Sequence, residues 1–142
     1  MPPSFLHQPK PVRVLIVDDH DGYAGSLTAI LTGNPRLRVV GRAVDGVHGI
    51  ELARELRPDV VVMDVNMPRL DGFSATHKIL SELPSTRVVI VSADPEADHR
   101  LRARDAGADA YLPKDADFHE LDQAIAGEQA RAEASFFLAM AV

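Results

Sequence analysis

Hydrophobic residues along the chain follow two patterns that alternate. Short runs rich in valine and isoleucine end in polar side chains, and between these runs lie longer stretches in which apolar residues recur every three or four positions. Unbroken apolar runs of about four to eight residues are typical of strands buried on both faces, whereas the longer spacing is typical of helices with one buried face. The pattern therefore predicts strands and helices in alternation.

Five segments have the strand pattern. The most apolar of them, Val60–Asp64, ends in a carboxylate and is followed by Asn66 and a Met-Pro pair. β-Branched residues favour strands, and an unbroken run of them favours a central position in a parallel sheet. The other predicted strands, in chain order, are Val12–Val17, 37–41, 88–91 and 108–112.

Five further segments have the helical spacing, and residues that disfavour helices follow several of them. The predicted helices cover about 23–31, 46–56, 73–83, 96–106 and 117–125. Pro35, Pro58 and Pro84 stand just beyond the first three, where proline commonly ends a helix. The fourth helix is rich in charge and has Leu101 as its one large apolar residue, so we expect a surface helix with little anchorage in the core.

A parallel sheet covered by helices on both faces follows from this alternation, and its crossover connections are expected to be right-handed. The length of 142 residues suits one such domain, which we assign to residues 12–126. A flexible, proline-rich lead-in of residues 1–11 precedes it. Residues 127–142 are rich in alanine and end in apolar residues. We expect there a helical extension that docks on this body or on a partner chain; the alternatives are the start of a linker or a frayed end.

Composition and charge exclude several classes of protein. The 15 Lys and Arg residues and 21 Asp and Glu residues give a formal charge of −6, and without a basic cluster the chain lacks the usual means of binding nucleic acid. It has no cysteine, which removes disulfides, thiolate metal sites and cysteine nucleophiles. No apolar run reaches membrane-spanning length, and the first residues lack the apolar core of a secretory signal. We therefore expect a cytoplasmic location with no membrane contact.

Polar side chains stand where four of the predicted strands end. Asp18 and Asp19 follow the first strand, Asp64 ends the third, Ser92 follows the fourth, and Lys114 comes shortly after the fifth. The carboxyl ends of parallel strands share one edge of a sheet, so we expect these side chains to converge. Grouped carboxylates repel one another, and a cation relieves the repulsion. Hard oxygen ligands favour Mg²⁺, with Mn²⁺ as the alternative.

These residue types suit the transfer of a phosphoryl group. A metal ion, the ammonium of Lys114 and the hydroxyl of Ser92 together match the oxygens of that group. One carboxylate must then attack phosphorus, and Asp64, on the central strand, is the best placed nucleophile. Taken singly, each residue has a simpler explanation, with Asp18, Asp19 and Ser92 as helix caps and Lys114 as a solvated loop residue. Their joint occurrence at the strand ends argues against coincidence.

The same segments resemble a known family over about residues 12–125. The motifs are VLIVDDH (14–20), DVVVMDVNMPRLDG (59–72), VSA (91–93) and GADAYLPKD (107–115). They are similar to those of the receiver domain of bacterial two-component response regulators, and the Asp-Asp-His start resembles the branch that usually carries a LuxR/NarL-type helix-turn-helix output domain. The resemblance implies a flavodoxin-like (CheY-like) α/β fold, a doubly wound five-stranded parallel sheet in the order 2-1-3-4-5 with helices on both faces.

The resemblance also implies the phosphate acceptor and the metal ligands. Asp64 would accept phosphate from a sensor histidine kinase or a histidine phosphotransfer protein. Asp19, Asp64 and the backbone carbonyl of Asn66 would bind Mg²⁺, with Asp18 helping through a water molecule.

By the same resemblance, Ser92 and Lys114 would bind the phosphoryl oxygens, and Tyr111 would be the switch residue that turns inward when Ser92 moves. The alternative for Tyr111 is a half-buried strand aromatic with its hydroxyl in water. An acyl phosphate adds up to about two negative charges, which would pull Ser92 and Lys114 toward it and shift the weakly anchored helix 96–106. The face made by the fourth helix, fifth strand and fifth helix is then the expected signalling surface.

Two functions from different classes stay open on the sequence alone. The first is a phospho-accepting switch, not a conventional enzyme, that catalyses its own aspartyl phosphorylation and dephosphorylation. It would form a homodimer and control transcription through an output domain absent from this chain. The second is a stand-alone flavodoxin-like module that signals by protein contact without phosphorylation. A hydrolase of small phosphate esters that uses Asp64 is a remote third, because no residue is evident as its dedicated general base.

Overall fold

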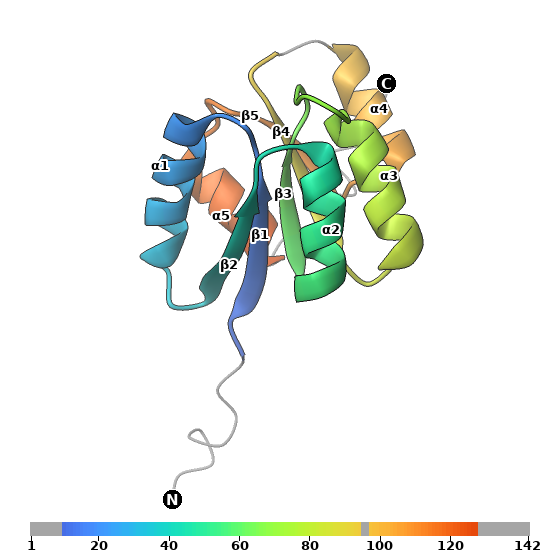
Figure 1. Ribbon diagram of the computed structural model, residues 1–142. Helices are drawn as coiled ribbons and strands as arrows, with labels where there is room; N and C mark the ends of the chain where they lie inside the picture. Colours follow the sequence, from blue (N-terminus) through green and yellow to red (C-terminus); the bar gives the residue numbers. More distant parts are fainter. Residues whose placement is uncertain (1–9, 95–96, 128–142) are drawn as a thin grey trace, which may run out of the picture.

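The computed structural model of the chain describes residues 10–94 and 97–127. A central sheet is covered by helices on both of its faces (Figure 1). Most of the predicted lead-in and of the predicted C-terminal extension, namely residues 1–9 and 128–142, lies outside the described residues. Within residues 10–94 and 97–127, no helix is long and apolar enough to cross a membrane.

Strands and helices alternate throughout the described part of the chain, as the hydrophobic pattern predicts. In order, the elements are β1 (Val12–Val17), α1 (Asp21–Thr32), β2 (Leu37–Ala43), α2 (Gly46–Leu56), β3 (Val60–Asp64), α3 (Gly72–Glu82), β4 (Arg87–Ser92), α4 (Ala97–Ala106), β5 (Ala110–Pro113) and α5 (Phe118–Ala126). Most bounds agree with the predicted ones to within one or two residues, which is the usual uncertainty at element ends.

The sheet has the predicted topology. All its strands pair in parallel, in the order β2-β1-β3-β4-β5, which confirms the flavodoxin-like fold. The most apolar segment, β3, lies at the centre between β1 and β4, and each of its residues is buried. Because the strands are parallel, the carboxyl ends of β1, β3, β4 and β5 lie at one edge of the sheet.

Side chains of successive strand residues enter two different apolar layers. Leu15 and Val17 of β1 pack with residues of α2, α3 and α4, whereas Val14 and Ile16 pack with residues of α1 and α5. Figure 1 shows the same division, with α1 and α5 on one side of the sheet and α2 and α3 on the other. The two-residue period of a strand explains it, and burial on both faces explains why these strands have no polar alternation.

β4 is one residue longer at each end than predicted, and two further strands, β2 and β5, differ by two residues at one end. β2 continues to Ala43, because its pairing with β1 resumes after an irregularity in the register. β5 begins two residues late, at Ala110, because the N–H of Ala108 donates to the carbonyl of Ala103 and closes α4 instead. β5 also extends to Pro113, where proline is tolerated because the strand lies at the edge of the sheet.

α4 is weakly anchored, which confirms the expectation from its sequence. Among the α4 side chains that the structure describes, Ala103 is the buried one, and Leu101 is 43 % exposed. An alanine contributes little apolar area. The packing of α4 therefore rests on few contacts, and a shift of this helix costs less than a shift of α2 or α3 would.

Candidate functional site

Predicted site residues lie at the carboxyl edge of the sheet. Asp18 and Asp19 directly follow β1, Asp64 is the last residue of β3, Ser92 is the last of β4, and Lys114 directly follows β5. The fold thus brings residues that are distant in the sequence to one edge, as the alternation of strands and helices predicts.

The ammonium of Lys114 joins two of the carboxylates. Its Nζ lies 2.8 Å from Asp18 Oδ2 and 3.2 Å from Asp64 Oδ1. The side chain of Lys114 is only 11 % exposed, so the simpler explanation of a solvated loop lysine is wrong. Its backbone N–H donates to the carbonyl of Ser92 at 2.8 Å, and this bond fixes the residue to the end of β4.

Asp18, Asp19, His20 and Asp64 form a compact group that we call the acidic cluster. One donor atom from each of the four residues lies within 4.8 Å of the others. Asp18 and Asp64 are buried, whereas Asp19 and His20 are exposed. A cluster of three carboxylates that is open to solvent on one side suits a hard divalent cation that keeps some of its bound water.

The imidazole of His20 is part of this cluster, although the sequence pattern predicted no role for it. Its Nδ1 lies 3.1 Å from Asp18 Oδ1, 3.2 Å from Asp19 Oδ1 and 3.6 Å from Asp64 Oδ2. The position of His20 directly after Asp18 and Asp19 could have indicated its role. The N–H of His20 donates to Asp18 Oδ1 at 2.8 Å, and this bond turns the chain back over the end of the strand. His20 itself is the N-cap residue of α1 and makes no side-chain cap bond, so neither aspartate caps that helix.

Burial changes the protonation of the central carboxyl. Burial, with the negative charge of Asp18 beside it, raises the pKa of Asp64 from 3.8 to about 6, although Lys114 and His20 act in the opposite direction. Asp64 Oδ2 is buried and has no hydrogen-bond partner in the described structure. An ionised carboxylate in this position is costly, and a bound cation would lower that cost.

Backbone packing behind the site holds Asp64 in place. The N–H of Gly72, the first residue of α3, donates to the carbonyl of Val65 at 2.8 Å. A Cβ at position 72 would overlap the backbone oxygen of Asp64, so only glycine allows α3 to begin this close to the end of β3. Asp71 caps the same helix through bonds of 2.9 Å from the N–H groups of Phe73 and Ser74. The Asp-Gly pair therefore positions the end of β3 as well as starting a helix.

Ser92 is fully buried and is occupied locally. Its hydroxyl donates to the carbonyl of Asp94 at 3.2 Å and accepts from the Asp94 N–H at 3.0 Å. The hydroxyl of Tyr111 donates to the same carbonyl at 2.9 Å, and Tyr111 is 1 % exposed. The alternative of a half-buried Tyr111 with its hydroxyl in water is thus wrong. Ser92 and Tyr111 share one acceptor, so a movement of one changes the bonding of the other.

Two more residues stand near the acidic cluster. Asn66 lies in the exposed loop directly after β3, at the same edge of the sheet. Tyr23 of α1 faces the ammonium of Lys114, whose Nζ lies 4.6 Å from the centre of its ring. Burial, and then the charges of Asp18 and Asp64, raise the pKa of Tyr23 to about 12. From the sequence, Tyr23 was predicted only to lie at the start of a helix, because an aromatic residue in an amphipathic segment does not indicate a cation–π contact.

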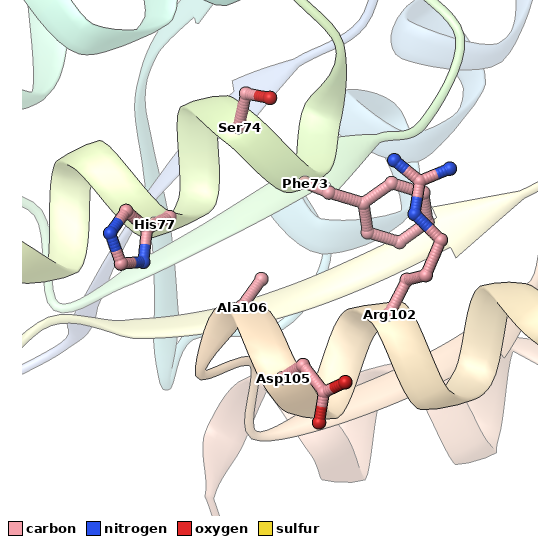
Figure 2. Close-up of a pocket in the computed structure, with 6 residues that line it drawn as sticks. All are labelled: Phe73, Ser74, His77, Arg102, Asp105 and Ala106. Carbon is pink, nitrogen blue, oxygen red and sulfur yellow. The ribbon is translucent and has the colours of Figure 1, made fainter.

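A separate hollow of about 380 Å³ lies between α3 and α4 (Figure 2). In Figure 2 the guanidinium of Arg102, from α4, lies against the ring of Phe73, from α3, and its central carbon is 4.3 Å from the ring centre. Ser74, His77, Asp105 and Ala106 complete the lining. None of these residues belongs to the acidic cluster, so the hollow is distinct from the candidate site.

Comparisons with known proteins agree with the geometry. The family model of the response regulator receiver domain matches residues 14–126. The response regulator GacA of Pseudomonas aeruginosa is 44% identical over 114 residues, which are 80% of this chain and 53% of that protein. The chain thus spans about half the length of this curated relative.

Solved structures give the same result. The signal receiver domain of NarL from Mycobacterium tuberculosis has a TM-score of 0.80 and 34% identity, and the match covers 87% of this chain and 98% of that one. A CheX-CheY-BeF3-Mg+2 complex from Borrelia burgdorferi has a TM-score of 0.76 and 26% identity, covering 82% and 87% of the two chains. Fold, motif positions and relatives therefore lead to one conclusion: the chain belongs to the family of response regulator receiver domains of two-component systems.

Proposed function

We propose that this receiver domain accepts a phosphoryl group on Asp64 from a sensor histidine kinase or a histidine phosphotransfer protein. An Asp64 oxygen forms a bond to phosphorus while the bond from phosphorus to the donor nitrogen breaks, and the donor leaves with the electron pair. The observation that carries the proposal is the environment of Asp64. Its Oδ2 is buried without a hydrogen-bond partner in residues 10–94 and 97–127, and its Oδ1 lies 3.2 Å from Lys114 Nζ.

Mg²⁺, or Mn²⁺ in its place, is the proposed cofactor. The cation would be held by Asp19, Asp64 and the carbonyl of Asn66, with Asp18 acting through water, and it would supply positive charge to the transferring group. The donor set fits, because three carboxylates against the one ammonium of Lys114 leave a formal charge of −2 in the site. The relative crystallised with BeF3 and Mg²⁺ supports the same assignment.

Lys114 and Ser92 are the proposed ligands of the phosphoryl oxygens. Lys114 already lies against Asp64, so it can follow the charge from the carboxylate to the acyl phosphate. Ser92 must release the carbonyl of Asp94 to reach the new group, and this release breaks the arrangement that it shares with Tyr111. The signal then passes to α4, β5 and α5, where α4 is weakly anchored.

The remaining proposals concern the whole protein. We propose that residues 12–126 form the receiver domain, with a lead-in before it and a helical extension or linker after it, and that the protein works as a homodimer. Transcriptional control through a further domain is the proposed output. The matched region is 53% of the response regulator GacA, so that relative has room for such a domain. The domain is a self-phosphorylating switch and not a conventional enzyme.

Labelling with acetyl phosphate tests the central proposal. We expect Mg²⁺-dependent gain of one phosphate by the wild-type chain, seen by intact-protein mass spectrometry, and its loss on addition of EDTA. Asp64→Asn should abolish the gain, because the amide cannot attack phosphorus. Asp105→Asn, which changes an exposed carboxylate of α4, is the matched control and should be labelled normally. Absence of labelling in the wild type would favour the module that signals by protein contact alone.

A further inference from the structure

His20 adds one imidazole nitrogen to a group of ligands that otherwise offers only oxygen. Its Nδ1 is within 3.6 Å of an oxygen from each of Asp18, Asp19 and Asp64. The His20 side chain is 60% exposed while those of Asp18 and Asp64 are almost fully buried, so the ring covers the mouth of the acidic cluster. The receiver chemistry proposed above does not use this nitrogen.

The cluster has the charge and the spacing of a site for a divalent ion. Its three carboxylates have a formal charge of −3, and Lys114 offsets only one of these charges, which leaves −2. The buried Oδ2 of Asp64 has no hydrogen-bond partner among the described residues. Metal–ligand distances of about 2.0–2.2 Å allow ligands on opposite sides of one ion to lie about 4.2 Å apart. The four donor atoms of the cluster lie within 4.8 Å of one another, so a contraction of a few tenths of an ångström suffices.

The nitrogen changes which ion such a site prefers. Mg²⁺ and Ca²⁺ select oxygen ligands, whereas imidazole suits nickel, copper, zinc and cobalt, and these ions bind mixed nitrogen and oxygen sites more tightly than Mn²⁺ does. In the neutral tautomer with the proton on Nε2, the lone pair of Nδ1 accepts from Lys114 Nζ at 3.2 Å, and an incoming ion takes the place of that donor. Nδ1 is the ring atom that faces Asp18, Asp19 and Lys114.

We propose that His20 Nδ1 and the carboxylates of Asp18, Asp19 and Asp64 form a mixed nitrogen–oxygen site for a divalent transition ion, with Ni²⁺, Co²⁺ and Zn²⁺ as the class of ligand. The ion competes with Mg²⁺ for the shared carboxylates. The inference deepens the proposed function, because it uses the same carboxylates, but the binding of the ion does not require that Asp64 be phosphorylated.

Titration of the full chain with Ni²⁺ alone, followed by calorimetry, tests the proposal. His20→Asn should weaken the Ni²⁺ affinity by at least about tenfold, because removing even the groups that support a metal ligand costs about 10- to 100-fold. The same variant should leave the Mg²⁺ affinity within about twofold, because the carboxylates are untouched. His77→Asn removes an exposed histidine of α3 and is the matched control, with no expected change. Equal Ni²⁺ affinity of His20→Asn and wild type, or an equal loss in His77→Asn, would overturn the proposal.

Paramagnetic NMR gives a second readout that does not depend on affinity. Co²⁺ bound at Nδ1 should shift ring protons of one histidine far outside the normal range, and His20→Asn should remove these signals while His77→Asn keeps them. Shifted histidine signals that persist in His20→Asn would also overturn the proposal. Acetyl phosphate labelling in Mg²⁺ is measured separately, so failure of labelling with a His20-dependent Ni²⁺ site, and labelling without such a site, are distinguishable results.

Discussion

At the scale of single residues, the acidic cluster that the proposed reaction needs lowers the stability of the fold. Asp64 is buried beside Asp18, and its pKa is raised to about 6, so the folded domain holds a proton that the unfolded chain releases at lower pH. Lys114 offsets only part of the negative charge, because it is shared between Asp18 and Asp64. A residue that must react with an incoming group cannot be fully satisfied before that group arrives, and the lost stability is a consequence of this requirement.

The raised pKa of Asp64 therefore predicts that the metal-free domain loses stability as the pH rises. The folded pKa of about 6 lies above the ordinary value of 3.8, so its contribution to stability is fully present below about pH 4 and is lost as the pH rises through 6. Asp64→Asn should raise the free energy of unfolding at pH 7.5 by about 1 to 2 kcal/mol, with little effect at pH 4. Urea unfolding in EDTA at both pH values measures it.

The same experiment has an internal control. Asp105→Asn, on the exposed surface of α4, should change the free energy of unfolding at neither pH. A destabilised Asp64→Asn at pH 7.5 would show that the carboxylate is favourably held in the absence of metal, contrary to the argument from burial.

At the scale of elements, the start of α3 links helix formation to the position of Asp64. Gly72 is buried, and a Cβ there would meet the backbone oxygen of Asp64 and the side chain of Met63. The requirement is one of space, because β3 and α3 approach each other directly. α4 has the opposite character. Ala103 is its one buried side chain among those described, and Arg102 and His99 contact α3 through the ring of Phe73 (Figure 2). α3 is therefore fixed to the end of β3, whereas α4 can shift at a lower cost in free energy.

Gly72→Ala should damage both stability and phosphorylation. The added methyl group must displace the end of β3, which costs about 1 to 3 kcal/mol of unfolding free energy, and the displaced Asp64 should be labelled more slowly by acetyl phosphate. Thermal unfolding and mass spectrometry measure the two effects. Gly25→Ala is the matched control, because a Cβ at that exposed position of α1 meets nothing within 4 Å and alanine favours a helix by about 0.5 to 1 kcal/mol. Equal behaviour of the two variants would contradict the proposed role of Gly72.

At the scale of the whole molecule, the alternation of two hydrophobic periods predicted a parallel sheet covered on both faces, whereas the strand order followed from the resemblance to receiver domains. Unbroken apolar runs such as Val60–Asp64 identify parallel strands, and the strand ends then specify which edge holds Asp18, Ser92 and Lys114. The irregularity between β1 and β2 and the late start of β5 were not predictable, because they depend on pairing partners that are distant in the sequence. His20 was missed because its role arises from geometry at a turn.

Hydrogen bonds within residues 10–94 and 97–127 hold the C-terminal end of α5, and they predict where the domain can be shortened. The guanidinium of Arg87, at the start of β4, donates to the carbonyls of Ala124 and Ile125 at 3.0 and 2.7 Å. Gly127 ends α5 with a φ of 76°, and its N–H donates to the carbonyl of Gln123. Three of the last four carbonyls of α5, those of residues 123–125, are thus satisfied by residues up to Gly127.

A chain that ends at Gly127 should therefore keep its fold and its Mg²⁺-dependent labelling, with a melting temperature within about 2 °C of the full chain. If the proposed homodimer depends on residues 128–142, the shortened chain should be monomeric by light scattering at concentrations where the full chain is dimeric. Arg87→Met in the shortened chain should lower the melting temperature by several degrees, because it leaves two helix carbonyls without donors. A shortened chain that unfolds would place the end of the domain beyond α5, and an unchanged dimer would move the interface to the described body, where α4 and α5 expose Leu101 and Phe118.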